Sequence, residues 1–411
     1  MSSFKQRFRE SSWVYLIAGV LFLFPALILL RAGSYNYTAG VLLIISISYC
    51  IVFRHKIGFN KEDGLFFTFI FSYPLILLIA VLVSNGRWSA LDYPWRAMAL
   101  IPIVLMLTQL KYDGRFQRFW IGGWIFGCVA AGSMAAYLVF WQGWLRVGSQ
   151  ITNEIPYGQI AAIMALGSLL FISNSKKILL RFICFLAAGF AIFSLAVSGT
   201  RGAWLGFVAG LLLCGMLAIR WNWRRFLLLA LIVGLAVFYL NSLTIVQVRL
   251  EGFKNEITAY QAGNTATSLG VRADLWHLSF ELAKQQPFFG VGPGNFKTAI
   301  APKIVDKPYL TEFSHAHSQY FDTLVNSGFV GLAVLLLSFL GPLYLFVARF
   351  KRSVGWNKVF ALQGCGLIVC TMVSALTQPL YAHNISVIFY LICLAVFWSF
   401  SGLKQPNEAV A

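Results

Sequence analysis

Residues 119–140 read FWIGGWIFGCVAAGSMAAYLVF, a stretch without a single charged side chain. A bilayer core about 30 Å thick is crossed by a helix of about 20 mostly apolar residues, and this stretch has that length. It is apolar all round, whereas a strand of a membrane β-barrel would alternate apolar and polar residues. The stretch therefore predicts a transmembrane helix.

Stretches of the same kind recur along the whole chain. We place twelve of them, at residues 13–30, 36–53, 65–84, 97–110, 119–140, 156–173, 178–198, 203–219, 226–243, 323–348, 359–377 and 384–401. Of the 411 residues, 59% are hydrophobic and 11% are charged, too few to cover a soluble globule. The sequence predicts an all-α polytopic membrane protein with about twelve transmembrane helices, solvated by membrane lipids.

The formal charge of +18 comes from 32 basic and 14 acidic residues, which in a soluble protein would suggest nucleic acid. Topology explains most of it. With the N-terminus in the cytoplasm, 20 of the 32 basic residues fall in inside loops, five in short outside loops and seven in one long outside loop. The positive-inside rule therefore predicts that both termini are cytoplasmic, and we expect no nucleic-acid partner.

The long outside loop runs from Thr244 to Asp322. It divides the chain into residues 1–243 with nine helices, a periplasmic loop domain at 244–322, and residues 323–411 with three helices and a short cytoplasmic tail. A long loop in a compact membrane protein is usually functional or disordered, and the composition of this one is not that of a disordered segment. We therefore expect the chemistry of the protein there.

Part of this loop has the pattern of an amphipathic helix. The sequence VRADLWHLSFELAKQQ, residues 271–286, places Val271, Leu275, Leu278 and Leu282 on one helical face, after a Ser/Thr-rich stretch suited to capping. Its simplest interpretation is a helix lying on the membrane surface, which is also compatible with a catalytic loop. The sequence FFGVGPGNF, Phe288 to Phe296, follows and predicts a tight turn that approaches a ligand.

Ion-coupled transporters carry buried carboxylates within their spans, and none of the twelve predicted spans contains an acidic residue. This argues against a proton or sodium carrier. All seven cysteines fall inside apolar stretches, so we expect neither disulfides nor a metal site. We therefore expect the functional residues on the outside face of the protein.

Two arginines there are candidates for binding an anion. Arg201 lies in the turn SGTRGAW, where the eighth span begins and the backbone presents free N–H groups. Arg272 lies near the start of the amphipathic helix. The alternatives are an interfacial side chain that reaches lipid headgroups for Arg201 and a solvated charge on a helix face for Arg272.

The sequence SHAHSQYFDTLVNSGFVGL, Ser314 to Leu332, leads from the long loop into the tenth span. With Ser314 as N-cap, a helix would place His317 at the outer end of a stripe whose inner part is Gly328 and Gly331. A histidine at that position can act as a neutral base.

Three alternatives stay open for this segment. His317 can be a structural hydrogen-bonding group. His315 and His317 can bind a metal, although on a helix their side chains would diverge by about 200°. Asp322 can be the base in place of His317, or cap and orient the segment.

The combination of these motifs resembles a known family. His317, Ser318, Gly328 and Gly331 are spaced as in the signature of bacterial O-antigen ligases and their polymerase relatives. The turn SGTRGAW resembles the first family arginine and TSLGVR the second, in the same order. The layout of spans, termini and one large periplasmic loop is similar over the whole chain.

The resemblance implies an inverting, metal-independent glycosyltransferase of the inner membrane, with a GT-C-like architecture and no cofactor. It implies transfer of O-antigen polysaccharide from undecaprenyl diphosphate to lipid A-core on the periplasmic face. Arg201 and Arg272 would bind the diphosphate and His317 would be the general base. His315 and Ser318, beside that base, would contact substrate.

Three other functions remain as alternatives. An O-antigen polymerase and a protein O-oligosaccharyltransferase share much of the pattern, although only one arginine-bearing periplasmic loop is seen and the chain ends soon after Ser401. The third alternative, from a different class, is an exporter of lipid or polysaccharide whose loop gates a path.

Overall fold

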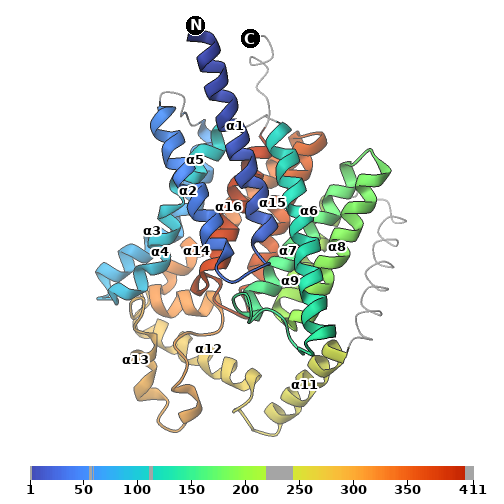
Figure 1. Cartoon of the computed structure of the whole chain (residues 1–411). Helices are drawn as coiled ribbons and strands as arrows, with labels where there is room; N and C mark the ends of the chain where they lie inside the picture. The colour runs from blue at the N-terminus through green and yellow to red at the C-terminus, as the bar shows by residue number, and fades with distance from the viewer. Residues whose placement is uncertain (1, 55–57, 59, 111–113, 219–243, 403–411) are drawn as a thin grey trace.

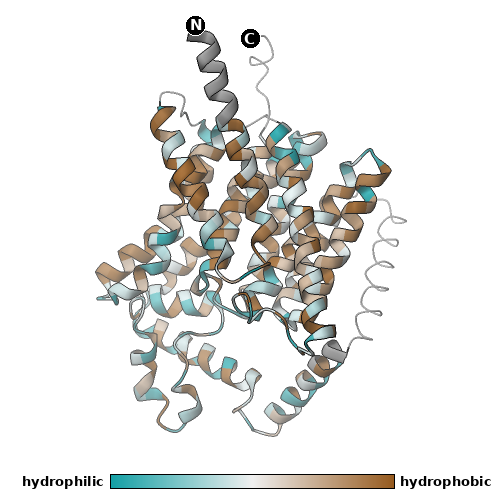
Figure 2. Ribbon diagram, viewed as in Figure 1, coloured by the Kyte–Doolittle hydropathy of each residue, from teal (hydrophilic) through white to brown (hydrophobic). Residues whose placement is uncertain are grey.

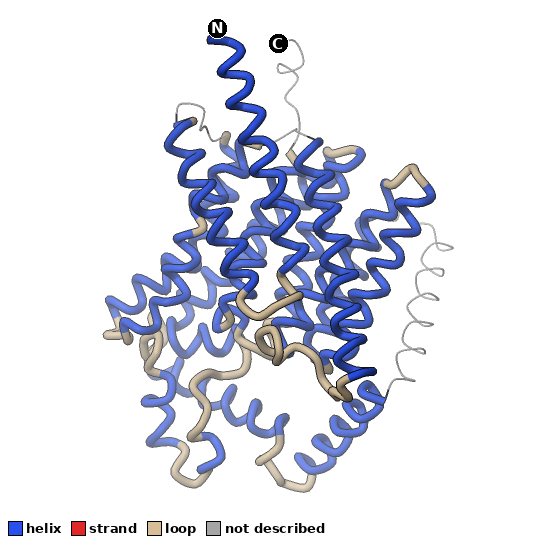
Figure 3. The backbone as a smooth tube through the Cα atoms, in the orientation of Figure 1, coloured by secondary structure: helices blue, strands red, loops and turns tan. Residues whose placement is uncertain are grey.

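The computed structural model describes residues 2–54, 58, 60–110, 114–218 and 244–402. Within these ranges the regular secondary structure is helical and contains no strand (Figure 3). The principal helices are α1 Ser2–Leu27, α2 Ser34–Val52, α3 Lys61–Val83, α4 Asp92–Ala99, α5 Ile101–Gln109, α6 Gly114–Ala136, α7 Glu154–Asn174, α8 Ile178–Ser198, α9 Arg201–Ala218, α11 Thr244–Gln261, α12 Ser268–Gln285, α13 Phe296–Ile300, α14 Gln319–Arg352, α15 Gly355–Ser374 and α16 Asn384–Phe400.

The described part of the chain contains nine helical segments long and apolar enough to cross a membrane, and two shorter apolar helices at Trp13–Leu27 and Asn384–Phe400. The predicted all-α polytopic membrane fold is confirmed. The predicted span at 226–243 lies outside the described residues. The predicted span at 97–110 corresponds to α5 together with part of α4, which form one crossing segment with the short helix η2, Trp88–Leu91.

The helices form one bundle, with a smaller layer across one end of it. Figure 1 shows α1 starting at the end of the bundle opposite to α11, α12 and α13. Apolar residues run along the bundle helices, whereas α11 and α12 mix polar and apolar residues (Figure 2). α16 is buried along its length and forms much of the core. Because the smaller layer comes from the segment after residue 243, it corresponds to the long loop expected from the sequence.

The apolar face predicted for α12 is present, but its partner is protein. Leu275, Leu278 and Leu282 are buried in a second hydrophobic cluster with α13 and the turn before α14. The side chain of Thr267 caps the helix by accepting a hydrogen bond from the N–H of Gly270 at 3.2 Å. This apolar face is therefore covered by the chain itself, in place of the membrane surface that the amphipathic pattern alone suggested.

The tight turn predicted at Phe288–Phe296 is present, and glycines 290, 292 and 294 have positive φ angles. The turn closely approaches the backbone of α14. This helix is interrupted at Gly328, which has φ 66° and ψ −166°. The N–H of Phe329 donates to the carbonyl oxygen of Pro287 at 2.7 Å, and the N–H of Val291 donates to that of Val325 at 2.9 Å. A Cβ atom at Gly328 would lie 2.3 Å from the carbonyl oxygen of Phe288. The turn thus satisfies the backbone groups that the interruption leaves open.

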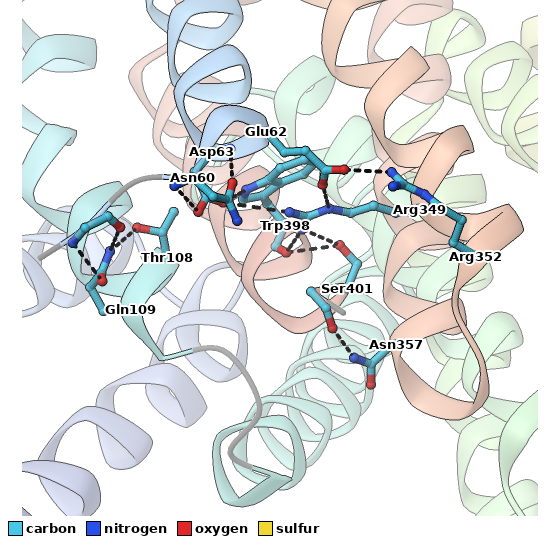
Figure 4. A network of polar contacts seen from close by, with 12 residues as sticks. Asn60, Glu62, Asp63, Thr108, Gln109, Arg349, Arg352, Asn357, Trp398 and Ser401 are labelled. Atoms are coloured by element: carbon cyan, nitrogen blue, oxygen red, sulfur yellow. Dashed lines mark hydrogen bonds and ion pairs between the residues drawn. The ribbon is translucent and has the colours of Figure 1, made fainter. Parts of the chain in front are cut away.

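A buried ionic network lies at the opposite end of the bundle from the smaller layer. We call it the Arg349 network (Figure 4); it consists of Glu62, Asp63, Arg349, Arg352, Trp398 and Ser401. α3 begins four residues before the predicted span, so Glu62 and Asp63 belong to its first turn, and Asp63 is 1% exposed. The observed helices extend beyond the predicted spans, and their first turns carry acidic residues that the spans lack: two in α3 and one each in α4, α7 and α14.

Arg349 holds this network together. Its Nη1 donates to the carbonyl oxygen of Trp398 at 2.6 Å, and its Nη2 lies 3.7 Å from Oδ1 of Asp63. The guanidinium carbon lies 3.1 Å from the centroid of the Trp398 ring, whose Nε1 donates to Asp63 at 2.9 Å. The network joins α3, α14 and α16, because each of these helices contributes at least one of its residues.

Candidate functional site

His317 lies in the turn that enters α14, outside the helix. The helix begins at Gln319 with the buried Ser318 at the N-cap position, so the prediction of Ser314 as N-cap is wrong. His317 has φ +50°, a left-handed conformation uncommon for a residue with a side chain. The predicted helical stripe from His317 to Gly331 is also wrong, because it begins outside the helix and is broken at Gly328.

Contacts from α12 and α14 hold this turn in place. Oδ1 of Asp322 accepts a hydrogen bond from the N–H of Ala316 at 3.3 Å. The indole N–H of Trp276 donates to the carbonyl oxygen of Ala316 at 3.0 Å, and the Trp276 ring stacks on Phe321 with centroids 5.1 Å apart. In this geometry Asp322 orients the turn that carries His317, as one of the alternatives from the sequence proposed.

The ring of His317 is fixed by a hydrogen-bonded chain from the loop before α16. Nδ1 of His317 lies 3.1 Å from Oε1 of Gln378, and Nε2 of Gln378 lies 3.2 Å from Nε2 of His383. Since an amide oxygen only accepts, this arrangement puts the His317 proton on Nδ1 and leaves Nε2 with a free lone pair. That tautomer is the one a general base requires.

The electrostatic environment favours neutral His317. Burial lowers its pKa from 6.5, and the positive charge of Arg272 lowers it further, whereas the hydrogen bond to Gln378 acts in the opposite direction. At neutral pH the imidazole is therefore unprotonated and able to accept a proton.

His315 lies against His317. Their ring centroids are 4.4 Å apart at an interplanar angle of 72°, so the predicted divergence of the two side chains is wrong; it assumed a helix that begins later. Nδ1 of His315 accepts the N–H of His317 at 3.3 Å. Burial lowers the pKa of His315 to about 4, and the charges on His317 and His383 add to this effect. Among the described residues, no group of three or more His, Cys, Asp or Glu is placed to hold a metal ion.

Arg201 lies where predicted, at the first residue of α9 after a tight turn. Gly199 ends α8 in the left-handed conformation, and the Thr200 hydroxyl donates to the carbonyl oxygen of Glu154 at 2.9 Å. Nη2 of Arg201 lies 3.2 Å and 3.3 Å from the two carboxylate oxygens of Glu256, and the guanidinium covers the ring of Phe253 at 4.9 Å. Its Nη1 is buried and has no hydrogen-bond partner among the described residues.

Arg272 projects from the first turns of α12 and is partly buried. Within the described ranges its guanidinium makes no side-chain hydrogen bond or ion pair. Burial lowers its pKa and the positive charge of Arg201 lowers it further, whereas Glu256 acts in the opposite direction. Arg272 in turn lowers the pKa of His317, so the charges of the two arginines and the histidine influence one another in sequence. The structure thus brings together the three residues singled out from the sequence.

Sequence reasoning missed three residues of this site. Gln378 and His383 stand in the polar stretch TQPLYAHN between two apolar helices, and that interruption was the available signal. Glu256 stands among several charged residues of α11, and nothing in its sequence context distinguishes it from them.

The fold and this site define a polytopic membrane protein that presents a neutral histidine and two arginines at one end of its bundle. Residues 186–336 match a family model described as O-antigen ligase. A protein of Haemophilus influenzae (strain ATCC 51907 / DSM 11121 / KW20 / Rd), described as an uncharacterized protein, is 27% identical over 409 residues, covering 95% of this chain and 99% of the relative. The predicted resemblance is confirmed at the level of the superfamily, and the matched segment contains Arg201, Arg272, His315, His317 and Ser318.

Proposed function

We propose that this protein is an inverting glycosyltransferase that needs no metal ion and joins O-antigen polysaccharide, carried on undecaprenyl diphosphate, to lipid A-core. The observation that carries the proposal is that two arginines and a neutral histidine lie close together: the positive charge of Arg201 lowers the pKa of Arg272, and that of Arg272 lowers the pKa of His317. The match of residues 186–336 to the O-antigen ligase family model supports a lipid-linked polysaccharide donor.

In this proposal the two arginines bind the donor diphosphate. Arg201 and Arg272 carry two positive charges against the single negative charge of Glu256, so the pair attracts a further anion. The unpartnered Nη1 of Arg201 and the guanidinium of Arg272 supply donors for phosphate oxygens. These groups stabilise the charge that develops on the diphosphate as its bond to the sugar breaks.

His317 acts as the general base. Its Nε2 takes the proton of an acceptor hydroxyl while that oxygen forms a bond to the anomeric carbon of the donor sugar. On the opposite face of that carbon, the bond to the phosphate oxygen breaks, and its electron pair leaves with the diphosphate. A single displacement of this kind inverts the anomeric configuration. Gln378 holds the required tautomer of His317, and His315 and Ser318 line the approach to it.

The topology expected from the sequence completes the proposal. We place the end of the bundle that carries the Arg349 network, with both chain termini, in the cytoplasm. The smaller layer formed by 244–322, with the candidate site, then faces the periplasm of a bacterial inner membrane, between helices from 1–243 and 323–411. Basic residues gather in the loops assigned to the cytoplasm, which supports this orientation.

Deleting the gene in its own host tests the reaction. A ligase mutant leaves lipid A-core without any attached O-antigen, as seen by electrophoresis of its lipopolysaccharide. A core that carries one repeat unit would identify a polymerase instead and would contradict the proposal.

A second test separates an enzyme from an exporter. The purified full chain, mixed with lipid-linked donor and lipid A-core in the absence of any membrane gradient, should form the joined product. No product from folded protein, together with transport of donor across vesicles, would favour the exporter.

A further inference from the structure

A cavity of about 440 Å³ lies beside the turn that carries His317. Its volume falls in the range of small-molecule binding sites. It opens to the surface and is bordered by α3, η2, α4, α14, the glycine-rich turn and the loop before α16. Its lining includes Tyr73, Tyr93, His315, Asp322, Asn326 and Tyr381.

The charges of the lining disfavour an anionic ligand. None of the lining residues is a lysine or an arginine. Of the two acidic lining residues, Asp92 pairs with Arg96 at 2.9 Å, and Asp322 remains as a negative charge facing the cavity. Asp322 is not paired with any cation in the described ranges; it accepts the N–H of Ala316. A phosphate, diphosphate or carboxylate would meet repulsion here, so this cavity and the arginine pair suit different parts of a substrate.

The uncharged groups of the lining match a polyhydroxy compound. Oδ1 of Asn326 is buried and has no hydrogen-bond partner among the described residues. The neutral ring of His315 accepts a hydrogen bond at Nδ1, which leaves the Nε2 proton as a donor. The hydroxyls of Ser89 and Ser314 can both donate and accept. A ring that carries several hydroxyl groups satisfies such a mixture of donors and acceptors.

An aromatic wall adds a surface for the apolar face of a sugar ring. Tyr93 and Tyr381 are stacked with centroids 4.7 Å apart, and Tyr381 lies 5.1 Å from Tyr73. The wall is held rigidly, because Gln319 donates to the Tyr73 hydroxyl at 3.0 Å and accepts the N–H of Tyr381 at 3.1 Å. Tyr93 is partly exposed, unlike the buried Tyr73 and Tyr381, and is the ring that a ligand can reach.

The cavity adjoins the proposed base. His315 lines it, and the His315 ring is in edge contact with His317. A hydroxyl group of a molecule held in the cavity is therefore near the residue that would take its proton.

We propose that this cavity binds a neutral sugar ring of the acceptor and orients its hydroxyl group toward His317. The identification of that sugar as part of the acceptor rests on the proposed function; the affinity for a neutral sugar does not. Asn326 and Tyr93 are then positioning residues for the acceptor, and the arginine pair holds the donor diphosphate separately.

Direct binding tests the site without any turnover. The full chain is held in lipid nanodiscs, because sugar-headed detergents would compete. Saturation-transfer NMR is recorded with methyl α-D-glucopyranoside and methyl α-D-galactopyranoside, and with inorganic pyrophosphate as a competitor. We expect transfer to the ring protons of at least one glycoside, loss of that signal in Tyr93→Ala, and no displacement by pyrophosphate.

The matched control is Tyr344→Ala, which removes the same side chain at a position that is 71% exposed on α14 and does not line the cavity. Its signal should equal that of the unsubstituted protein. Absence of transfer for both glycosides, an unchanged signal in Tyr93→Ala, or displacement by pyrophosphate would each overturn the inference.

Kinetics separates this inference from the proposed function. In Asn326→Leu, loss of one hydrogen bond should raise KM for lipid A-core about threefold to tenfold and leave KM for the donor unchanged. The melting midpoint of the variant should match that of the unsubstituted protein. Sugar binding that depends on Tyr93 without ligation would reject the proposed function alone. Ligation with an unchanged acceptor KM in Asn326→Leu would reject this inference alone.

Discussion

Arginines gather at both ends of this molecule, and the two groups differ in how they are neutralised. In the Arg349 network, Arg349 and Arg352 meet the carboxylates of Glu62 and Asp63, so two positive charges face two negative ones (Figure 4). At the other end, Arg201 and Arg272 share one carboxylate, that of Glu256. Among the residues that the structure describes, the first group meets each arginine with a carboxylate, and the second has a positive charge in excess.

The difference extends to hydrogen bonding and burial. Arg349 is 2% exposed, and the hydrogen-bond acceptors around it belong to α3, to α16 and to Ser401, which caps α16. Arg201 keeps a buried nitrogen without a partner, and its side chain is 28% exposed. A closed network stabilises the fold, whereas spare charge and spare donors near the surface are suited to binding an anion. Substitutions at the two ends should therefore affect different properties.

The largest effect on activity is expected from His317→Ala. Removing the base should lower kcat about 10²- to 10⁴-fold, the range typical of general base catalysis. The melting midpoint should change little, because His317 lies in a turn and is only partly buried. Product formation by the purified variant and its thermal unfolding are the measurements. Ligation at the unsubstituted rate would show that His317 is structural.

Arg349→Ala should have the largest effect on stability. It removes the guanidinium that lies 3.7 Å from the buried carboxylate of Asp63, and breaking comparable buried pairs costs about 3–5 kcal/mol. Arg352→Ala is the matched control, because Arg352 is 51% exposed and its pair with Glu62 should contribute about 0–1 kcal/mol. Unfolding of both variants in nanodiscs measures the difference. Equal losses would contradict the distinction between a closed network and a surface pair.

Arg201→Ala and Arg272→Ala should each lower kcat about 10²- to 10³-fold, as expected when one donor to the developing charge is removed. Lysine at either position should restore only part of the rate, because it keeps the charge but loses the two-pronged geometry. Arg31→Ala, at an exposed position between α1 and α2, is the control for loss of charge alone. A similar loss of rate in that control would indicate a general electrostatic effect.

The pH dependence of kcat/KM should reflect the lowered pKa of His317. Because burial and Arg272 disfavour its protonated form, the pKa of His317 lies below 6.5, and the rate falls about tenfold per pH unit only below that lowered pKa. Rates between pH 4 and pH 8, with melting midpoints over the same range to exclude unfolding, test this. An acidic limb centred above pH 6.5 would contradict the assignment of His317 as the base.

The sequence predicted the helical membrane fold, and it singled out three residues that the structure places in the candidate site. Uncharged stretches of bilayer length leave little freedom in fold class. Arg201 and Arg272 were found because each lies near the start of a helix on the expected outside face. A cap for α12 from the Ser/Thr-rich stretch before it was also predicted, since capping depends on neighbouring residues alone, and Thr267 supplies it.

What the sequence could not predict depends on contacts between distant segments. The interruption of α14 at Gly328 is satisfied by the turn at 287–291, about 40 residues earlier, so no local pattern reveals it. The orientation of His317 depends on Gln378, which lies 61 residues further along the chain. A helical stripe was predicted through both glycines because periodicity assumes an unbroken helix.

The smallest effect concerns Glu256, the one carboxylate of the arginine pair. Glu256 forms an ion pair with Arg201 in the structure, so a bound diphosphate must compete with Glu256 for Arg201. Glu256→Gln removes that competing charge and should lower KM for the donor by up to about fivefold, the range of a partly exposed ion pair. Steady-state kinetics at low and high salt measures the change, which should shrink as salt screens the charges. If Glu256 instead positions Arg201, KM for the donor would rise in the same variant. That result would contradict the view that excess positive charge distinguishes this end of the molecule from the Arg349 network.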